Sequence, residues 1–138
     1  IVTQAYATTS KVTNILSEDV NVSAVVPARG ESGVISSDVT SASAGLLRMS
    51  YLSSDTKVQP GDIVTTSGAG GIYPQDVIIG EVQSVQKAEN DISYYAVVRP
   101  YEDLTNVQES FVVIDFPGAG DGEEIPVQKD PEGEEDAE

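Results

Sequence analysis

The chain contains no histidine and no cysteine among its 138 residues. Without an imidazole, a Ser-His-Asp triad, a histidine metal ligand and the usual general base of near-neutral pKa are all excluded. The absence of cysteine excludes a disulfide framework and thiolate metal sites, and it is compatible with either redox compartment. Most common hydrolase designs fail on these grounds. We therefore expect a protein that is not an enzyme and that needs no cofactor and no metal.

Tryptophan is also absent, and aromatic residues make up only 6% of the chain, so the core must be built on Val, Ile and Leu. Basic side chains are few: 7 Lys and Arg against 23 Asp and Glu give a formal net charge of -16. Such a chain repels nucleic acid phosphates and anionic membrane surfaces. The composition therefore argues against a nucleic acid partner.

No run of about 18 apolar residues occurs, so no segment of this sequence is long enough to cross a bilayer as a helix. The chain opens at Ile1 in a strand-like pattern, without Met and without a charged-then-apolar signal region. We interpret it as a piece of a longer protein whose membrane anchor lies outside this sequence.

Short β-strand patterns fill the first 116 residues, and the architecture that they predict is all-β, a sandwich or small barrels. In residues 45–52, strict alternation would place Leu47, Met49 and Tyr51 on one face. Val82 and Val85 break the alternation of their segment, which predicts a bulge or a bend between them. Helix patterns are weak, and residues 100–110 predict no more than a single turn. The predicted strands are 1–7, 11–16, 20–26, 33–36, 45–52, 62–67, 77–86, 93–100 and 110–116.

Residues 117–138 differ from the rest of the chain, because they mix Gly, Pro and acidic residues and carry nine acids and one Lys. This composition offers too little apolar surface to offset the entropy of ordering the segment. It predicts a disordered acidic C-terminal tail.

A glycine-rich stretch, "GDIVTTSGAGGIYPQ" at residues 61–75, invites a nucleotide-binding interpretation. A P-loop needs Lys and then Ser or Thr after its last glycine, but Gly71 is followed by Ile72. A dinucleotide fingerprint needs a third glycine at position 73, which is Tyr73 here. The stretch instead predicts tight turns in which Gly68, Gly70 and Gly71 supply positive φ angles.

Taken in order, the motifs around this stretch resemble the extracytoplasmic region of the MreC family, the bacterial rod shape-determining proteins. The resemblance covers about residues 1–116. It departs from the family pattern at Ala69, where Leu is usual, and at Gln75 and Asp76, where Lys-Gly is common; an Asp tolerates a left-handed turn position. The matching positions are Val58, Gly61, Asp62, Val64, Thr66, Ser67, Gly68, Gly70, Gly71, Tyr73, Pro74, Gly80, Val82, Pro100, Asp103 and Leu104.

The resemblance implies a fold of two small six-stranded β-barrels. Residues 1–20 and 92–116 would belong to the first barrel, which is incomplete here, and residues 21–91 would form the second barrel, followed by the tail at 117–138. The glycine-rich stretch would then be a corner of the second barrel. The structural turn motif on this interpretation comprises Gly61, Asp62, Ser67, Gly68, Gly70, Gly71, Tyr73, Pro74 and Gly80.

The resemblance also implies a function, that of a non-enzymatic scaffold of the cell-elongation machinery outside the cytoplasmic membrane. Its expected partners are the class B penicillin-binding protein of that machinery, further copies of the chain, and, through the parent protein, MreD, RodA and MreB. Recognition would use strand edges and exposed apolar surface. As partner-binding residues we expect Tyr94, Tyr95, Tyr101 and Phe116, because aromatics are scarce in this chain.

An alternative resemblance stays open, since "VQPGDIV" at residues 58–64 is also similar to the strand entry of membrane-fusion adaptors and lipoyl-like barrels. A lipoyl domain would need a modifiable Lys at a hairpin tip. Residues 88–93, "AENDIS", offer none.

Overall fold

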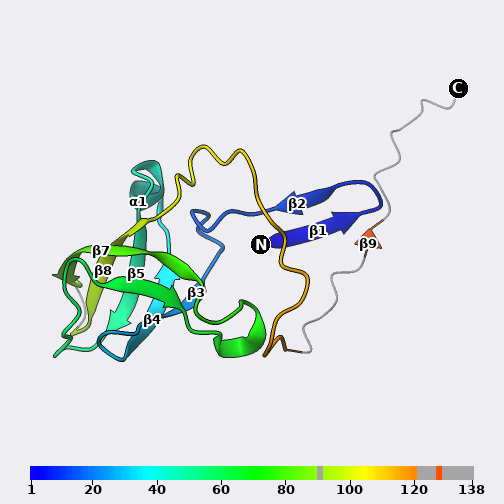
Figure 1. Ribbon diagram of the computed structural model, residues 1–138. Helices are drawn as coiled ribbons and strands as arrows, with labels where there is room; N and C mark the ends of the chain where they lie inside the picture. The colour runs from blue at the N-terminus through cyan, green and yellow to red at the C-terminus, as the bar shows by residue number, and fades with distance from the viewer. Residues whose placement is uncertain (90–91, 121–126, 129–138) are drawn as a thin grey trace, which may run out of the picture.

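The computed structural model of this chain describes residues 1–89, 92–120 and 127–128. Its main body is a closed barrel of six antiparallel strands in the order β3-β4-β5-β8-β7-β6 (Figure 1). Closure joins β3 to β6 through the pairs Ala24↔Thr66 and Val25↔Thr65. The strands of the barrel are β3 (Val22–Val26), β4 (Glu31–Ser36), β5 (Leu47–Leu52), β6 (Ile63–Thr66), β7 (Ile78–Lys87) and β8 (Tyr94–Pro100).

The barrel core follows from alternation along each strand, since successive side chains point to opposite faces. In β3, Val22, Ala24 and Val26 are buried while the residues between them are half-exposed. The interior is filled almost entirely by aliphatic side chains, as a composition poor in aromatics requires. Its fully buried large residues are Val26, Ile35, Leu47, Met49, Leu52, Val64, Val82 and Val98.

A second, smaller sheet lies beside the barrel, in the order β2-β1-β9 (Figure 1). Its strands are β1 (Val2–Tyr6), β2 (Ser10–Val12) and β9 (Val127–Gln128). The described residues thus form one closed barrel and a three-stranded sheet, which confirms the all-β class; of a first barrel they show only this sheet.

Strand β8 belongs to the closed barrel, although the expected domain boundaries place it in the first barrel. The resemblance places residues 92–116 in the first barrel, but β8 pairs on one edge with β5 and on the other with β7. It also contributes Ala96 and Val98 to the closed core. The physical reason is the long antiparallel pairing with the preceding strand β7, which places β8 between β7 and β5 in the barrel wall.

The predicted strand 110–116 is absent, because this segment pairs with no strand of the described residues. Its apolar side chains face solvent instead: Phe111 is 99% exposed and Ile114 is 93% exposed. A short helix, α1 (Val39–Ser43), was not predicted. Asp38 caps it by accepting a hydrogen bond from the Ser41 amide at 2.7 Å.

Register shifts interrupt three of the strand pairings in the barrel wall, and two of them bear on the sequence predictions. The register of β7 against β8 shifts between Val82 and Ser84, which confirms the predicted bulge. In β5 the register shifts between Met49 and Leu52. Tyr51 there takes a φ of 66° and is 73% exposed, so the expectation that it shares the inward face of Met49 was wrong. The bulge turns Leu52 inward in its place.

No helix among the described residues is both long and apolar enough to cross a membrane. Of the predicted disordered tail, residues 121–126 and 129–138 lie outside the described part of the chain. Within the described part, Val127 and Gln128 pair in parallel with Ala5 and Tyr6 of β1.

Candidate binding groove

The connection between β6 and β7, residues 67–76, is called here the glycine corner. Gly68, Gly70 and Gly71 adopt φ angles of 73°, 83° and 67°, which L side chains rarely take. Asp76 also lies in the left-handed region, with φ of 62°. These four positions help the chain to turn back from β6 into the antiparallel strand β7, which a regular strand or helix cannot do.

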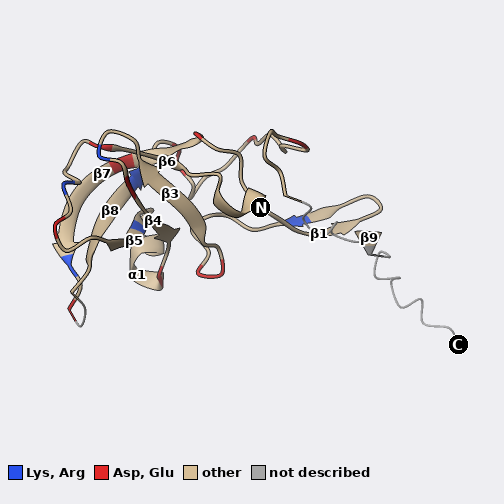
Figure 2. Cartoon of the chain, turned by 90° about the horizontal axis from the view of Figure 1, so that it is seen from below, with Lys and Arg blue, Asp and Glu red and all other residues tan. Residues whose placement is uncertain are grey.

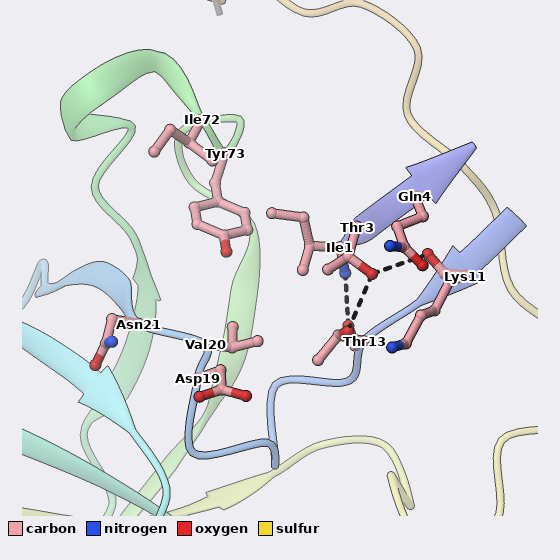
Figure 3. A pocket seen from close by; sticks show the side chains of 10 residues that line it. All are labelled: Ile1, Thr3, Gln4, Lys11, Thr13, Asp19, Val20, Asn21, Ile72 and Tyr73. Atoms are coloured by element: carbon pink, nitrogen blue, oxygen red, sulfur yellow. Dashed lines mark hydrogen bonds between the residues drawn. The ribbon is translucent and has the colours of Figure 1, made fainter. Parts of the chain in front are cut away.

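Thr66 holds the glycine corner closed. Its buried hydroxyl donates to the Pro74 carbonyl at 2.5 Å and accepts from the Val77 amide at 2.9 Å. At the other side of the corner, the Ser67 amide donates to the Ser23 carbonyl of β3 at 2.9 Å. The result is a fixed corner, and the ring of Tyr73 within it lies on the side of Ile1 (Figure 3).

Asp62, at the entry to β6, is a structural carboxylate. It accepts two hydrogen bonds from Arg29, at 2.8 Å and 3.1 Å, and one from the Gln59 amide at 3.0 Å. The hydrogen bond from Arg29 is the main reason that the pKa of Asp62 is lowered from its ordinary value. These hydrogen bonds outweigh the opposing effect of burial and stabilise the ionised form, so this group is not poised to exchange protons near neutral pH.

Gly80 is required for a different reason. A Cβ at this position would lie 2.1 Å from the Arg99 carbonyl oxygen on the facing strand. The absence of a side chain therefore lets β7 and β8 approach closely at the end of the barrel.

Where the glycine corner meets the small sheet, the surface is hollowed by three cavities. Their volumes are about 580, 490 and 270 Å³. All three are lined by Ile1 and Tyr73, so they are parts of one depression, which we call the junction groove. Its apolar lining includes Ile1, Val2, Val12, Ile15, Val20, Ile72, Tyr73, Leu104, Phe111, Val112, Val113 and Phe116.

Figure 3 shows the more polar end of the groove, between Tyr73 and strands β1 and β2. Thr3 lies within hydrogen-bond distance of the Thr13 hydroxyl at 3.4 Å and donates to the Lys11 carbonyl at 3.3 Å. Burial raises the pKa of Tyr73 above its ordinary value, so its phenol stays neutral. Asp19 lines the same end.

One side chain joins the small sheet to the segment that borders the groove. The Asn14 amide donates to the Leu104 carbonyl at 2.8 Å, and its oxygen accepts from the Leu16 amide at 2.8 Å. Asn14 therefore fixes residue 104 beside the exit of β2, although its role was not predicted. A single Asn in a loop carries no sequence pattern that reveals a partner ninety residues away.

The four predicted partner-binding aromatics fall into two pairs. Tyr94 packs partly against the barrel core, and the ring of Tyr95 lies 3.8 Å from the Arg48 guanidinium. Tyr101 and Phe116, in contrast, line the junction groove. The structure therefore does not bring the four together at one site.

The most exposed apolar residues near the groove were not among the predicted ones. Phe111, Val112, Val113 and Ile114 are 99%, 65%, 60% and 93% exposed. We call them the apolar segment. The sequence pattern had suggested a paired strand there, in which alternate side chains would be buried. Contiguous exposed apolar surface of this kind typically marks an interaction site.

The acidic side chains of the described residues do not gather into a metal-binding cluster. Among these residues, no group of three or more His, Cys, Asp or Glu side chains is placed to hold a metal ion. The carboxylates whose pKa is lowered, Asp38, Asp55, Asp62 and Asp103, are hydrogen-bonded by their own neighbouring loops or by Arg29. The arrangement suits binding by surface contact.

Comparisons with known proteins identify the family and the fold of the chain. The family model "Rod shape-determining protein MreC, barrel core" matches residues 1–114. The cell shape-determining protein MreC of Bacillus subtilis (strain 168) is 38% identical over 56 residues, which are 41% of this chain and 19% of that protein. The chain thus matches about a fifth of the length of this curated relative.

Two solved structures share the fold. MreC from Pseudomonas aeruginosa aligns with a TM-score of 0.61 and 17% identity, over 72% of this chain and 64% of that one. The second is a complex between a penicillin-binding protein (PBP2) and MreC from Helicobacter pylori, which aligns with a TM-score of 0.56 and 21% identity, over 64% of this chain and 54% of that one. The family match decides between the two resemblances raised by the sequence, against a lipoyl-like or membrane-fusion adaptor barrel. This chain belongs to the MreC family of rod shape-determining proteins.

Proposed function

We propose that this chain is the extracytoplasmic binding part of a non-enzymatic scaffold that organises peptidoglycan synthases during cell elongation. The family membership supports the scaffold role. The proposed partner is the extracytoplasmic region of the class B penicillin-binding protein, by analogy with the Helicobacter pylori complex of PBP2 and MreC. The proposed location is the outer face of the bacterial cytoplasmic membrane, with the parent protein anchored there and linked to MreD, RodA and MreB.

The observation that carries this proposal is the apolar segment beside the junction groove. Phe111 and Ile114 are almost wholly exposed, and the groove next to them is lined mainly by aliphatic and aromatic side chains. A chain with net charge -16 has ample polar surface with which to stay soluble, so an uncovered apolar stretch calls for a partner. Burying such side chains is the main source of affinity at protein interfaces.

Self-association is the second part of the proposal. The small sheet ends in β2, and Val12 on that strand is 63% exposed. An outer strand presents unpaired amides and carbonyls, which pair readily with a strand of another copy. The closed barrel offers no such edge, since each of its strands has two neighbours.

The test is calorimetric titration of the full chain into the extracytoplasmic region of the same organism's class B penicillin-binding protein. We expect saturable binding in the micromolar range with a negative heat-capacity change, since apolar surface is buried. The double variant Phe111→Ser with Ile114→Ser removes two large apolar side chains and should weaken binding by about 3 kcal/mol, roughly a hundredfold.

The matched control is Val39→Ser, on helix α1 of the barrel. Val39 is 72% exposed, so its replacement also removes exposed apolar surface, but from outside the junction groove. Binding by Val39→Ser should equal that of the unmodified chain. Equal weakening by both variants would show that the apolar segment is not the contact surface, and absence of binding by the unmodified chain would refute the partner.

A further inference from the structure

The chain beyond residue 114 lies outside the family match, yet it returns to the body of the protein. The Gly120 amide donates to the Gly71 carbonyl of the glycine corner at 3.1 Å. A turn directly precedes this contact in the chain. In it, the Ala119 amide donates to the Phe116 carbonyl at 3.0 Å, and Gly118 takes a φ of 87°. The chain that borders the junction groove at Phe116 is thereby tied to the corner.

The contact brings backbone against backbone. A Cβ on Gly71 would lie 2.4 Å from the Gly120 nitrogen and 2.9 Å from the Gly118 oxygen. One residue earlier, Gly70 has the same left-handed backbone, but a Cβ there would meet nothing within 4 Å. The lack of a side chain at Gly71 therefore serves the approach of residues 118–120 as well as the turn.

A second contact lies at the small sheet. Val127 and Gln128 form β9, which pairs in parallel with Ala5 and Tyr6 along the edge of β1 that β2 leaves open (Figure 1). An uncovered strand edge accepts an added strand from any chain that reaches it. Here the added strand belongs to the same chain.

Electrostatic attraction does not explain this docking. Residues 1–116 hold 14 acids and 6 bases, a net charge of -8, and residues 117–138 hold nine acids and one Lys, also -8. In Figure 2 the acidic residues are spread over the barrel and its loops. Backbone hydrogen bonds must therefore overcome repulsion between like charges, and added salt should strengthen the docking by screening that repulsion.

We propose that the segment made of residues 115–120 and 127–128, called here the strap, docks on Gly71 and on the free edge of β1 and so occupies a strand-acceptor site. The strap is an internal competitor for any strand that would add to β1. The consequence for partner binding rests on the proposed function, whereas the docking itself does not.

The docking is tested by amide hydrogen exchange, followed by NMR on the full chain. The Gly120 amide should be protected in the unmodified chain and more so at moderate salt than at low salt. Gly71→Ala should abolish that protection, while Gly70→Ala, which imposes the same backbone strain without the collision, should keep it. An unprotected Gly120 amide in the unmodified chain, or equal protection in the two variants, would overturn the proposal.

A second variant covers the case in which Gly71→Ala fails to fold. Val127→Pro removes an amide of β9 while leaving the barrel untouched, and it should abolish the cross-strand nuclear Overhauser contacts between β9 and Ala5 of β1. Retention of those contacts would contradict the strap. In the titration with the penicillin-binding protein, Val127→Pro should bind more tightly than the unmodified chain, because the edge of β1 is then open to a strand of the partner in addition to the contact at the apolar segment. If neither binds, the partner is wrong, and the exchange result still decides whether the strap docks.

Discussion

Replacing Asp62 with Asn removes one negative charge from the entry to β6 while keeping the size of the side chain. The carboxylate accepts three hydrogen bonds, two from Arg29 and one from the Gln59 amide. An Asn amide group would place N–H donors against at least one of those donors. Hydrogen bonds to charged groups contribute about 1.5–3 kcal/mol each, and water can reach the partly exposed Arg29 after the change. We therefore expect Asp62→Asn to lower the free energy of unfolding by about 2 kcal/mol.

The assay is thermal unfolding by circular dichroism at pH 7, where a loss of this size lowers the Tm of a barrel of this length by on the order of 10 °C. The control is Asp19→Asn, which removes the same charge at an exposed position without a hydrogen bond to another described side chain. Because the chain carries net charge -16, any lost carboxylate relieves some repulsion, and the control measures that gain. A Tm for Asp62→Asn equal to that of the control would refute the structural role of the Arg29 pair.

The pH dependence follows from the same contacts. The pKa of Asp62 is lower in the folded state, first because Arg29 hydrogen-bonds its ionised form. A carboxylate of lowered pKa stabilises the fold above its unfolded pKa, about 3.9, and loses that contribution as the pH falls through the folded value. The difference in Tm between the unmodified chain and Asp62→Asn should thus be present at pH 7 and pH 5 and shrink below about pH 4.

Three further substitutions test other parts of the structure. Gly80→Ala should lower the free energy of unfolding by more than about 3 kcal/mol, because its Cβ would collide with the carbonyl of Arg99 on the facing strand. The control Gly30→Ala has positive φ but open space, and it should lower the free energy of unfolding by only about 1 kcal/mol. Urea unfolding compares the two variants, and equal midpoints would contradict the close approach of β7 and β8 at Gly80. Tyr51→Asn should raise stability by about 0.5–1 kcal/mol, since Asn tolerates a φ of 66° better than Tyr does; a lower midpoint would show that the exposed ring makes contacts that matter. Asn14→Ala should speed proteolysis of residues 104–116 without changing the Tm of the barrel by more than a few degrees, because only a loop contact is lost. Unchanged proteolysis would contradict the role of Asn14 in holding residue 104.

The barrel strands could be predicted because their signal is local. In β3, Val22, Ala24 and Val26 alternate with small or half-exposed residues, and such a pattern fits only one strand register. The bulge in β7 was also visible, since Val82 and Val85 stand an odd number of positions apart. The bulge at Tyr51 was not visible in the sequence, because Leu47, Met49 and Tyr51 continue a perfect alternation. Only the pairing of β5 with β8 shows the shift in register.

The groove could not be predicted, because it depends on contacts between distant segments. The sequence of residues 110–116 is that of a strand, but this segment pairs with no strand of the described residues, which leaves Phe111 and Ile114 exposed. The same limit applies to Asn14 and to Gly71, whose partners lie far along the chain. Scarcity of aromatics was a poor guide to exposure, since Tyr94 packs against the core while Tyr101 faces the groove.

The closure of the barrel has a mechanical consequence. Strands β3 and β6 meet through two residue pairs, whereas β7 and β8 share seven. A sheet ladder with fewer hydrogen bonds opens more readily, so the line between β3 and β6 is where local unfolding of the barrel should begin. That line runs directly into the glycine corner through the Ser67 to Ser23 hydrogen bond. A force applied at the corner would therefore act on the strand pair with few paired residues, β3 and β6. It would separate their residue pairs one after another, while β7 and β8 remained paired.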